Sequence, residues 1–116
     1  MKRSFVMTKE FDKSWKFMGL DDANLKQLQG NLLLNPQSGA VMQGTGGLRK
    51  LRFSVEPRGK SKSVRVIYID FMELEVLCLI TAYTKGNKEN ISEKEAQILK
   101  KTVIAIKESF ERGLRR

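Results

Sequence analysis

The stretch GTGGLRKLRFSV, residues 44–55, sets three glycines directly before an alternation of cations and hydrocarbons. Alternation with a period of two is typical of a β-strand that has one face in a core and the other in water. The pattern therefore predicts a strand over residues 48–55. Its apolar face comprises Leu51, Phe53 and Val55, and its polar face comprises Lys50, Arg52 and Ser54.

The chain continues in strand-like segments after this point. Residues 64–71 are rich in β-branched side chains, and residues 74–84 are apolar almost without interruption, which is typical of a central strand buried on both faces. A basic loop, PRGKSK at residues 57–62, joins the first two strands. Because the links between these segments are short, we expect antiparallel pairing.

Helical periodicity surrounds the strands. A short strand at residues 4–7 precedes Thr8, the predicted N-cap of a helix with Phe11, Trp15 and Met18 on one side. Asp21 or Asp22 then opens a leucine-rich second helix, which ends at the NPQSG turn of residues 35–39.

The last predicted element is also a helix. Residues 92–95, SEKE, form a capping box, and an apolar stripe follows at Ala96, Leu99, Val103, Ile106 and Phe110. We therefore predict one α+β domain over residues 1–116, with two N-terminal helices and a C-terminal helix on a curved, mainly antiparallel sheet of about four to five strands.

Positive charge is concentrated in the strand region. The chain of 116 residues has 22 Lys and Arg against 13 Asp and Glu, a formal charge of +9. Residues 49–65 contain seven cations and one acid, a local charge of +6. A solvated face is the ordinary explanation of such a run. Because strands hold these cations close together, the run instead favours a polyanionic partner that offsets their repulsion.

Several classes of site are excluded by composition. The chain has no His and a single Cys, Cys78, so imidazole catalysis, an internal disulfide and a thiolate metal cluster are ruled out. We expect neither a metal nor another cofactor. Residues 1–11 make a poor signal peptide, and no apolar run approaches a membrane span. A cytoplasmic protein without a membrane partner is therefore expected.

A longer ordered pattern carries a family resemblance. It consists of NPQSG at residues 35–39, VMQGTGGLRKLR at 41–52, RGK at 58–60, RVIY at 65–68, AYTK at 82–85 and KENIS at 88–92. This pattern resembles the HigB branch of the RelE/ParE toxins of bacterial type II toxin–antitoxin modules. The resemblance implies a small α+β toxin that enters the A site of the 30S subunit and cuts mRNA. It also implies a cognate antitoxin, HigA- or RelB-like, as partner.

The resemblance also implies roles for individual residues. Cleavage would use the RNA 2′-hydroxyl as nucleophile, with Lys50 as the candidate base, Arg52 positioning the substrate and Arg65 holding the scissile phosphate. Lys85 would stabilise or protonate the leaving group, and Tyr83 would assist or stack on a base. The glycine turn would bring the backbone close to RNA and aim Arg49, Lys50 and Arg52 into a concave site. Further contacts to RNA are expected from Arg49, Arg58, Lys60, Lys62 and Lys88.

Alternatives remain open at this stage. Tyr83 and Tyr68 lie in apolar strands and are equally well explained as core residues. The same fold could serve a toxin that does not cut RNA, as in the ParE branch that acts on DNA gyrase. A third alternative is an inactive relative that only binds RNA and an antitoxin.

Overall fold

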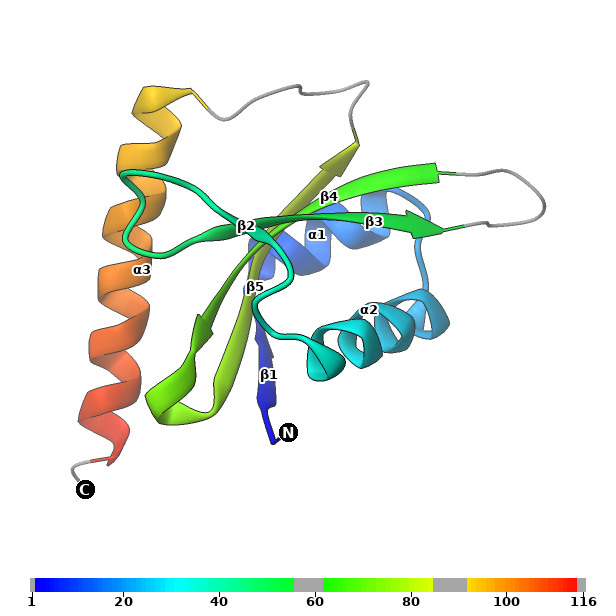
Figure 1. Cartoon of the computed structure of the whole chain (residues 1–116). Helices are drawn as coiled ribbons and strands as arrows, with labels where there is room; N and C mark the ends of the chain where they lie inside the picture. The colour runs from blue at the N-terminus through cyan, green and yellow to red at the C-terminus, as the bar shows by residue number, and fades with distance from the viewer. Residues whose placement is uncertain (1, 56–61, 85–91, 115–116) are drawn as a thin grey trace.

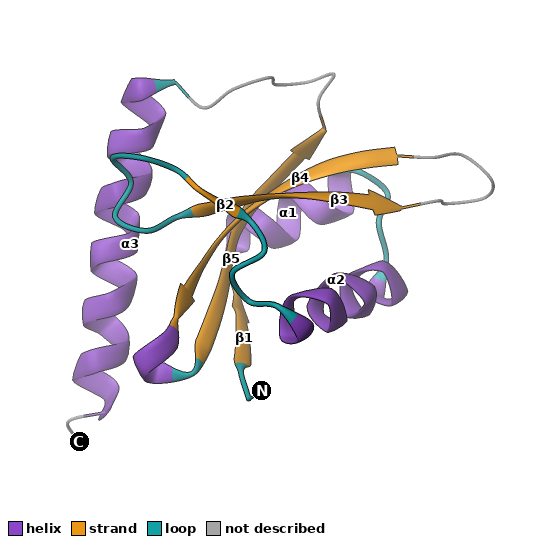
Figure 2. Cartoon of the chain, in the orientation of Figure 1, coloured by secondary structure: helices purple, strands orange, loops and turns teal. Residues whose placement is uncertain are grey.

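The structure, a computed structural model, describes residues 2–55, 62–84 and 92–114. Along the chain a short strand comes first, two helices follow, the remaining strands come next, and a long helix ends the described part (Figures 1 and 2). In order they are β1 (Ser4–Met7), α1 (Lys9–Phe17), α2 (Asp22–Leu34), β2 (Ala40–Val41), β3 (Arg49–Val55), β4 (Lys62–Phe71), the 3-10 turn η2 (Met72–Leu74), β5 (Val76–Thr84) and α3 (Glu93–Leu114).

The five described strands form one sheet in the order β1-β5-β4-β3-β2. The β2–β3, β3–β4 and β4–β5 pairs are antiparallel, and β1 runs parallel to β5. The predicted α+β architecture and its mainly antiparallel sheet are thus confirmed. The sequence pattern did not predict β2, because a strand of two residues is too short to show a period.

The last strand begins later than predicted. Residues Met72–Leu74 form a 3-10 turn, and Glu75 takes the left-handed conformation at a φ of 54° before β5 starts at Val76. The predicted boundary at residue 74 was wrong because the apolar Leu74 extends the strand-like composition into a turn.

The predicted helix caps are confirmed. The Thr8 hydroxyl accepts from the Phe11 amide at 3.0 Å, and Asp21 and Asn24 form a reciprocal capping box at the start of α2. Ser92 and Glu95 form the same type of box before α3, with bonds of 3.1 and 3.3 Å. Each cap satisfies amides that the first turn leaves without partners, and so fixes where the helix begins.

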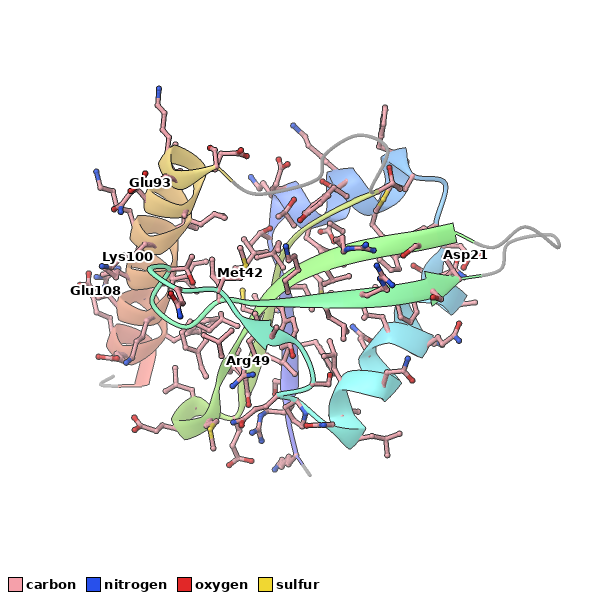
Figure 3. The ribbon with its side chains drawn as sticks, turned by 45° about the horizontal axis from the view of Figure 1, so that its top comes forward. Asp21, Met42, Arg49, Glu93, Lys100 and Glu108 are labelled. Atoms are coloured by element: carbon pink, nitrogen blue, oxygen red, sulfur yellow. The ribbon has the colours of Figure 1, made fainter. Side chains whose placement is uncertain are left out.

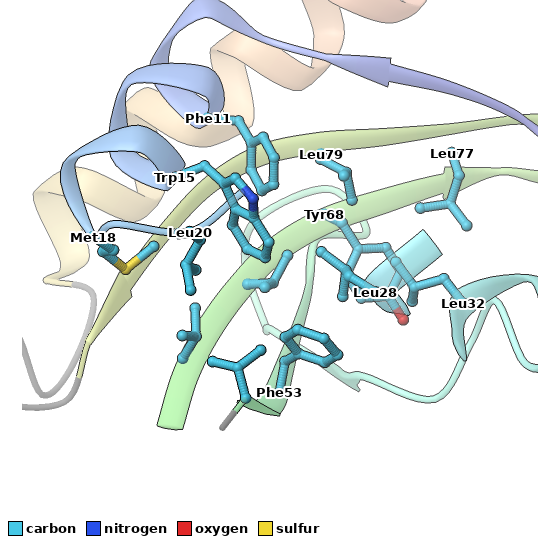
Figure 4. Close-up of a cluster of buried hydrophobic side chains, with 14 residues drawn as sticks. Phe11, Trp15, Met18, Leu20, Leu28, Leu32, Phe53, Tyr68, Leu77 and Leu79 are labelled. Atoms are coloured by element: carbon cyan, nitrogen blue, oxygen red, sulfur yellow. The ribbon is translucent and has the colours of Figure 1, made fainter. Parts of the chain in front are cut away.

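Each face of the sheet has its own core. The helices α1 and α2 cover one face, where Phe11 and Trp15 stack with centroids 5.2 Å apart and Trp15 stacks on Phe53 at 6.3 Å (Figure 4). Trp15, which the helical spacing places on one side with Phe11 and Met18, is therefore a core residue. The helix α3 covers part of the other face, over Ile67, Ile69 and Cys78.

The NPQSG turn is anchored to the first of these faces by Tyr68. The buried Tyr68 hydroxyl donates to the Pro36 carbonyl and accepts from the Gly39 amide, both at 2.9 Å. A Cβ at Gly39 would lie 2.9 Å from the Tyr68 ring and 3.0 Å from the Lys50 carbonyl oxygen. Only glycine therefore fits at residue 39, because the turn meets both a buried ring and the backbone of β3.

Replacing Gly39 by Ala should destabilise the protein by about 1–3 kcal/mol, since the added methyl must displace the ring or the strand. The matched control is Gly30→Ala in α2, where an added Cβ meets nothing within 4 Å. That change should raise stability by about 0.5–1 kcal/mol, because Ala is the better helix former. Urea unfolding of the two variants measures both effects, and equal free energies for the two would contradict the close packing at residue 39.

Candidate nucleic-acid interface

Three of the predicted site residues lie in one row across the sheet. Arg52 of β3 stands directly opposite Arg65 of β4, and Arg65 stands directly opposite Tyr83 of β5. Directly opposed residues of antiparallel strands have Cβ atoms roughly 5 Å apart. Lys50 is two residues from Arg52 on the same strand face, so the pairing brings two guanidinium groups and one ammonium group together. We call Lys50, Arg52 and Arg65 the cation row.

The cation row lies on the face of the sheet that α3 covers in part. Leu48, Ile67 and Ile69 of this face are buried under α3, whereas Arg52 is exposed and Lys50 and Arg65 are half-buried. Figure 1 shows β3 and β4 extending past α3. One face is thus apolar beneath the helix and cationic beyond it.

A β-bulge lies where this face of the sheet changes from its apolar part under α3 to its cationic part. Ile67 pairs with Thr81 but Tyr68 pairs with Leu79, so β5 carries an extra residue, Ile80. A bulge bends its strand and strengthens the local twist. Here it also keeps Ile80 and Tyr83 in the same apolar cluster, although a step of three residues along a regular strand would place them on opposite faces. The sequence did not reveal this bulge, because a run that is apolar almost without interruption hides a change from one face to the other.

The charges of the cation row are not matched by acids in the described part of the chain. The one ion pair found there joins Arg3 to Asp70, with Nε and Oδ1 2.7 Å apart, and it fastens the start of β1 to β4. The hydrogen bond to Asp70 is also the main cause of the raised pKa of Arg3. Like charges placed directly opposite each other destabilise a sheet. An anion over the row would therefore relieve repulsion between Arg52 and Arg65.

Arg49 is not part of this row. Alternation along β3 puts Arg49 on the opposite face, where its Nη1 donates to the carbonyls of Gln37 and Gly39 at 3.0 and 2.8 Å. Figure 3 shows Arg49 directed toward the segment that joins α2 to β2. The expectation that Arg49 shares a concave site with Lys50 and Arg52 was wrong, because neighbouring residues of a strand point to opposite sides.

The glycine turn lies away from the cation row, against α3. Gly44, Gly46 and Gly47 all have positive φ, and a Cβ at Gly46 would meet Lys100 of α3 at 3.7 Å (Figure 3). The buried Thr45 hydroxyl donates to the Met42 carbonyl at 2.6 Å and accepts from the Leu48 amide. The glycines thus shape a tight turn that packs on a helix. Their position gives no support to the prediction that this turn contacts RNA.

Tyr83 is buried beside Arg65. It is 9% exposed and belongs to the apolar cluster under α3. A cleft of about 570 Å³ opens next to it, lined by Thr81 and Tyr83 of β5, Ser14 of α1 and Ile98 and Thr102 of α3. The core assignments weighed for Tyr83 and Tyr68 are confirmed, and stacking on a base stays a prediction.

The side chains of the remaining predicted site residues lie outside the described part of the chain. Arg58, Lys60, Lys85 and Lys88 lie outside the described residues. Lys62 pairs with Val55 at the start of β4, and only its backbone is described. Their expected roles stay predictions. Among the described residues, no three His, Cys, Asp or Glu side chains gather as a metal site would require.

Cys78 is not available as a nucleophile. It is fully buried under α3, and burial raises the pKa of its thiol to about 11. A thiol reacts as its thiolate, which this environment disfavours. Cys78 is therefore a core residue and no candidate for chemistry on this face.

Comparison with known proteins shows a RelE-like fold. The chain superposes on a double mutant of the Escherichia coli toxin RelE in its free state with a TM-score of 0.53 and 19% identity, over 77% of this chain and 90% of RelE. The two N-terminal helices, the C-terminal helix and the five-stranded sheet define this fold here.

Weaker likenesses extend to other toxin structures. RelE in the archaeal RelE–RelB complex of Pyrococcus horikoshii OT3 matches at 18% identity and a TM-score of 0.47, over 76% of this chain and all of that one. YafQ from E. coli BL21(DE3) matches at 14% identity and a TM-score of 0.40, over 77% of this chain and all of YafQ. No family model matches the sequence.

An anion should stabilise the protein through the cation row. We expect about 5 mM pyrophosphate, at constant ionic strength, to raise Tm by a few degrees, because it binds the folded state and offsets the repulsion between Arg52 and Arg65. Arg52→Gln should lose most of this shift. Arg112 is an exposed residue of α3, so Arg112→Gln removes the same charge elsewhere and should retain the full shift in Tm. Equal shifts in both variants, measured by differential scanning fluorimetry, would argue against an anion site on the row.

The raised pKa of the Cys78 thiol predicts that the protein loses stability at alkaline pH. Its folded pKa of about 11 exceeds the ordinary value of 9.0, so its contribution is intact below pH 9 and declines as the pH rises toward 11. Between pH 8 and 10.5 the wild type should lose about 1–2 kcal/mol more than Cys78→Ala. Guanidinium unfolding of both proteins at the two pH values measures this difference, and parallel losses would contradict the raised pKa.

Proposed function

We propose that this chain is the toxin of a type II toxin–antitoxin module, of the HigB-like branch of the RelE/ParE superfamily. It acts as a ribosome-dependent endoribonuclease that cuts mRNA in the A site of the 30S subunit and so stops translation. The RelE-like fold supports the general class. The finer assignment is supported by the sequence pattern quoted above and by the chemistry of the cation row.

The observation that carries this proposal is the row itself. Arg52 and Arg65 oppose each other on neighbouring strands, Lys50 lies on the same face, and no described carboxylate neutralises them. Guanidinium groups bind phosphate oxygens with paired hydrogen bonds, and rigid strands hold them in place before substrate arrives. A ligand that suits such a row is the phosphodiester of a nucleic acid strand.

The proposed reaction is an internal transfer at phosphorus. The 2′-oxygen forms a bond to the adjacent phosphorus, the bond from phosphorus to the 5′-oxygen breaks, and a 2′,3′-cyclic phosphate and a 5′-hydroxyl result. Lys50, in its neutral form, takes the 2′ proton as the proposed general base. Arg65 and Arg52 stabilise the charge that develops on the phosphoryl oxygens. Lys85 supplies the proton to the 5′-oxygen.

The proposal also names partners and a place. The strong positive charge of the chain suits both ribosomal RNA and an acidic antitoxin of the HigA or RelB kind. None of the helices in the described segments combines the length and hydropathy needed to cross a bilayer. We propose action in the cytoplasm, where the ribosomes are.

Replacing Arg65 should abolish activity without unfolding the protein. Arg65→Ala, and separately Lys85→Ala, should reduce cleavage at least a hundredfold, since each removes charge stabilisation that a neutral side chain cannot replace. Primer extension on a defined mRNA, with and without purified ribosomes, measures cleavage. Growth after induction in bacteria measures toxicity. Arg112→Gln is the control for lost charge and should remain as active as the wild type.

Each result that contradicts the proposal indicates a different alternative. Full activity of Arg65→Ala and Lys85→Ala would refute the site. Wild-type toxicity with intact mRNA and arrested DNA supercoiling would indicate a gyrase poison of the ParE kind. Binding to RNA and antitoxin with neither cleavage nor toxicity would indicate an inactive relative.

A further inference from the structure

We infer that Ser63 is a positioning residue that holds the Arg65 guanidinium in the orientation needed to bind the scissile phosphate. This inference deepens the proposed function and rests on it for the identity of the substrate. It is carried by one contact on the open part of the sheet, the hydrogen bond from Arg65 Nη1 to the Ser63 hydroxyl at 2.8 Å.

The contact is built into the strand. Ser63 and Arg65 are two residues apart on β4, so both side chains lie on the face that carries the cation row. Both are half-buried, between the exposed end of the strand and the apolar cluster under α3. A hydrogen bond to a charged group is stronger in such partly desolvated surroundings than in open water.

The bond uses the side of the guanidinium that phosphate does not need. Ser63 occupies Nη1, which leaves the edge formed by Nε and Nη2 free to make the paired bonds that arginine offers to a phosphate. A long, flexible side chain would otherwise lose rotamer freedom on binding. Fixing Arg65 in advance lowers that cost and keeps the guanidinium beside Arg52, despite the repulsion between the two charges.

Ser54 provides an internal comparison. It stands directly opposite Ser63 on β3 and has the same hydroxyl, but it is exposed and makes no side-chain hydrogen bond to a described residue. The two serines share strand face, size and chemistry. A difference between their variants therefore reports the bond to Arg65 and not the loss of a hydroxyl from this surface.

The first arm of the test is kinetic. With ribosomes programmed by a defined mRNA, Ser63→Ala should lower the single-turnover cleavage rate about tenfold and change the half-saturating concentration little, because the charge of Arg65 remains while its orientation is lost. Ser63→Thr retains the hydroxyl on a β-branched side chain that suits a strand, and should recover activity to within about twofold. Ser54→Ala should match the wild type.

The second arm needs no ribosome and uses NMR of 15N-arginine-labelled protein. Arg65 Nη signals should show hindered rotation in the wild type and in Ser63→Thr, and faster rotation in Ser63→Ala. Titration with pyrophosphate should give a several-fold weaker affinity for Ser63→Ala than for Ser54→Ala. Arg65→Lys assigns the signals.

The two arms separate failure of this inference from failure of the proposed function. If the wild type cleaves mRNA and Ser63→Ala cleaves equally well, positioning by Ser63 is refuted while the nuclease stands. Equal losses in Ser63→Ala and Ser63→Thr would refute it too, since the hydroxyl would not matter. If the wild type does not cleave, the proposed nuclease fails and the NMR arm alone decides. Unchanged Arg65 rotation and pyrophosphate affinity in Ser63→Ala would then overturn the inference.

Discussion

The antiparallel register between β3 and β4 is the constraint on which the rest of the molecule depends. It sets Phe53 against Val64 in the core beneath α1 and α2, and by the same alternation it sets Arg52 against Arg65 on the opposite face. A shift of one residue would move the cations into the core and the hydrocarbons into water, at a cost of many kcal/mol. The hydrophobic core thus holds two like charges together that would otherwise separate.

The partial cover by α3 turns that face into a candidate site. The helix buries the hydrocarbon end of the face, and the bulge at Ile80 marks the change to the cationic end. A row of charges backed by a packed sheet has few ways to rearrange, which is the property that binding a phosphodiester in a defined geometry requires. The hydrogen bond from Arg65 to Ser63 further restricts the orientation of one side chain of the row.

Two prominent sequence motifs proved to be structural in this fold. The NPQSG turn is anchored by the Tyr68 hydroxyl and by Arg49, and the glycine turn packs Thr45 inward and lies against α3. Both motifs precede the cation row in the sequence, and Gly39 of the first packs against the backbone carbonyl of Lys50. Their glycines are needed for close approach and positive φ within the protein itself.

The sequence alone determined the fold class, the helix caps and the separation of Lys50 and Arg52 from the apolar face of their strand, because periods and caps depend on neighbouring residues. It also placed Arg49 beside those cations, although alternation assigns it to the other face. Tertiary structure alone decided that Arg52 opposes Arg65, that β1 joins β5 in parallel, and that β5 contains a bulge. Pairings between distant segments depend on how whole faces are buried, and no local pattern encodes them.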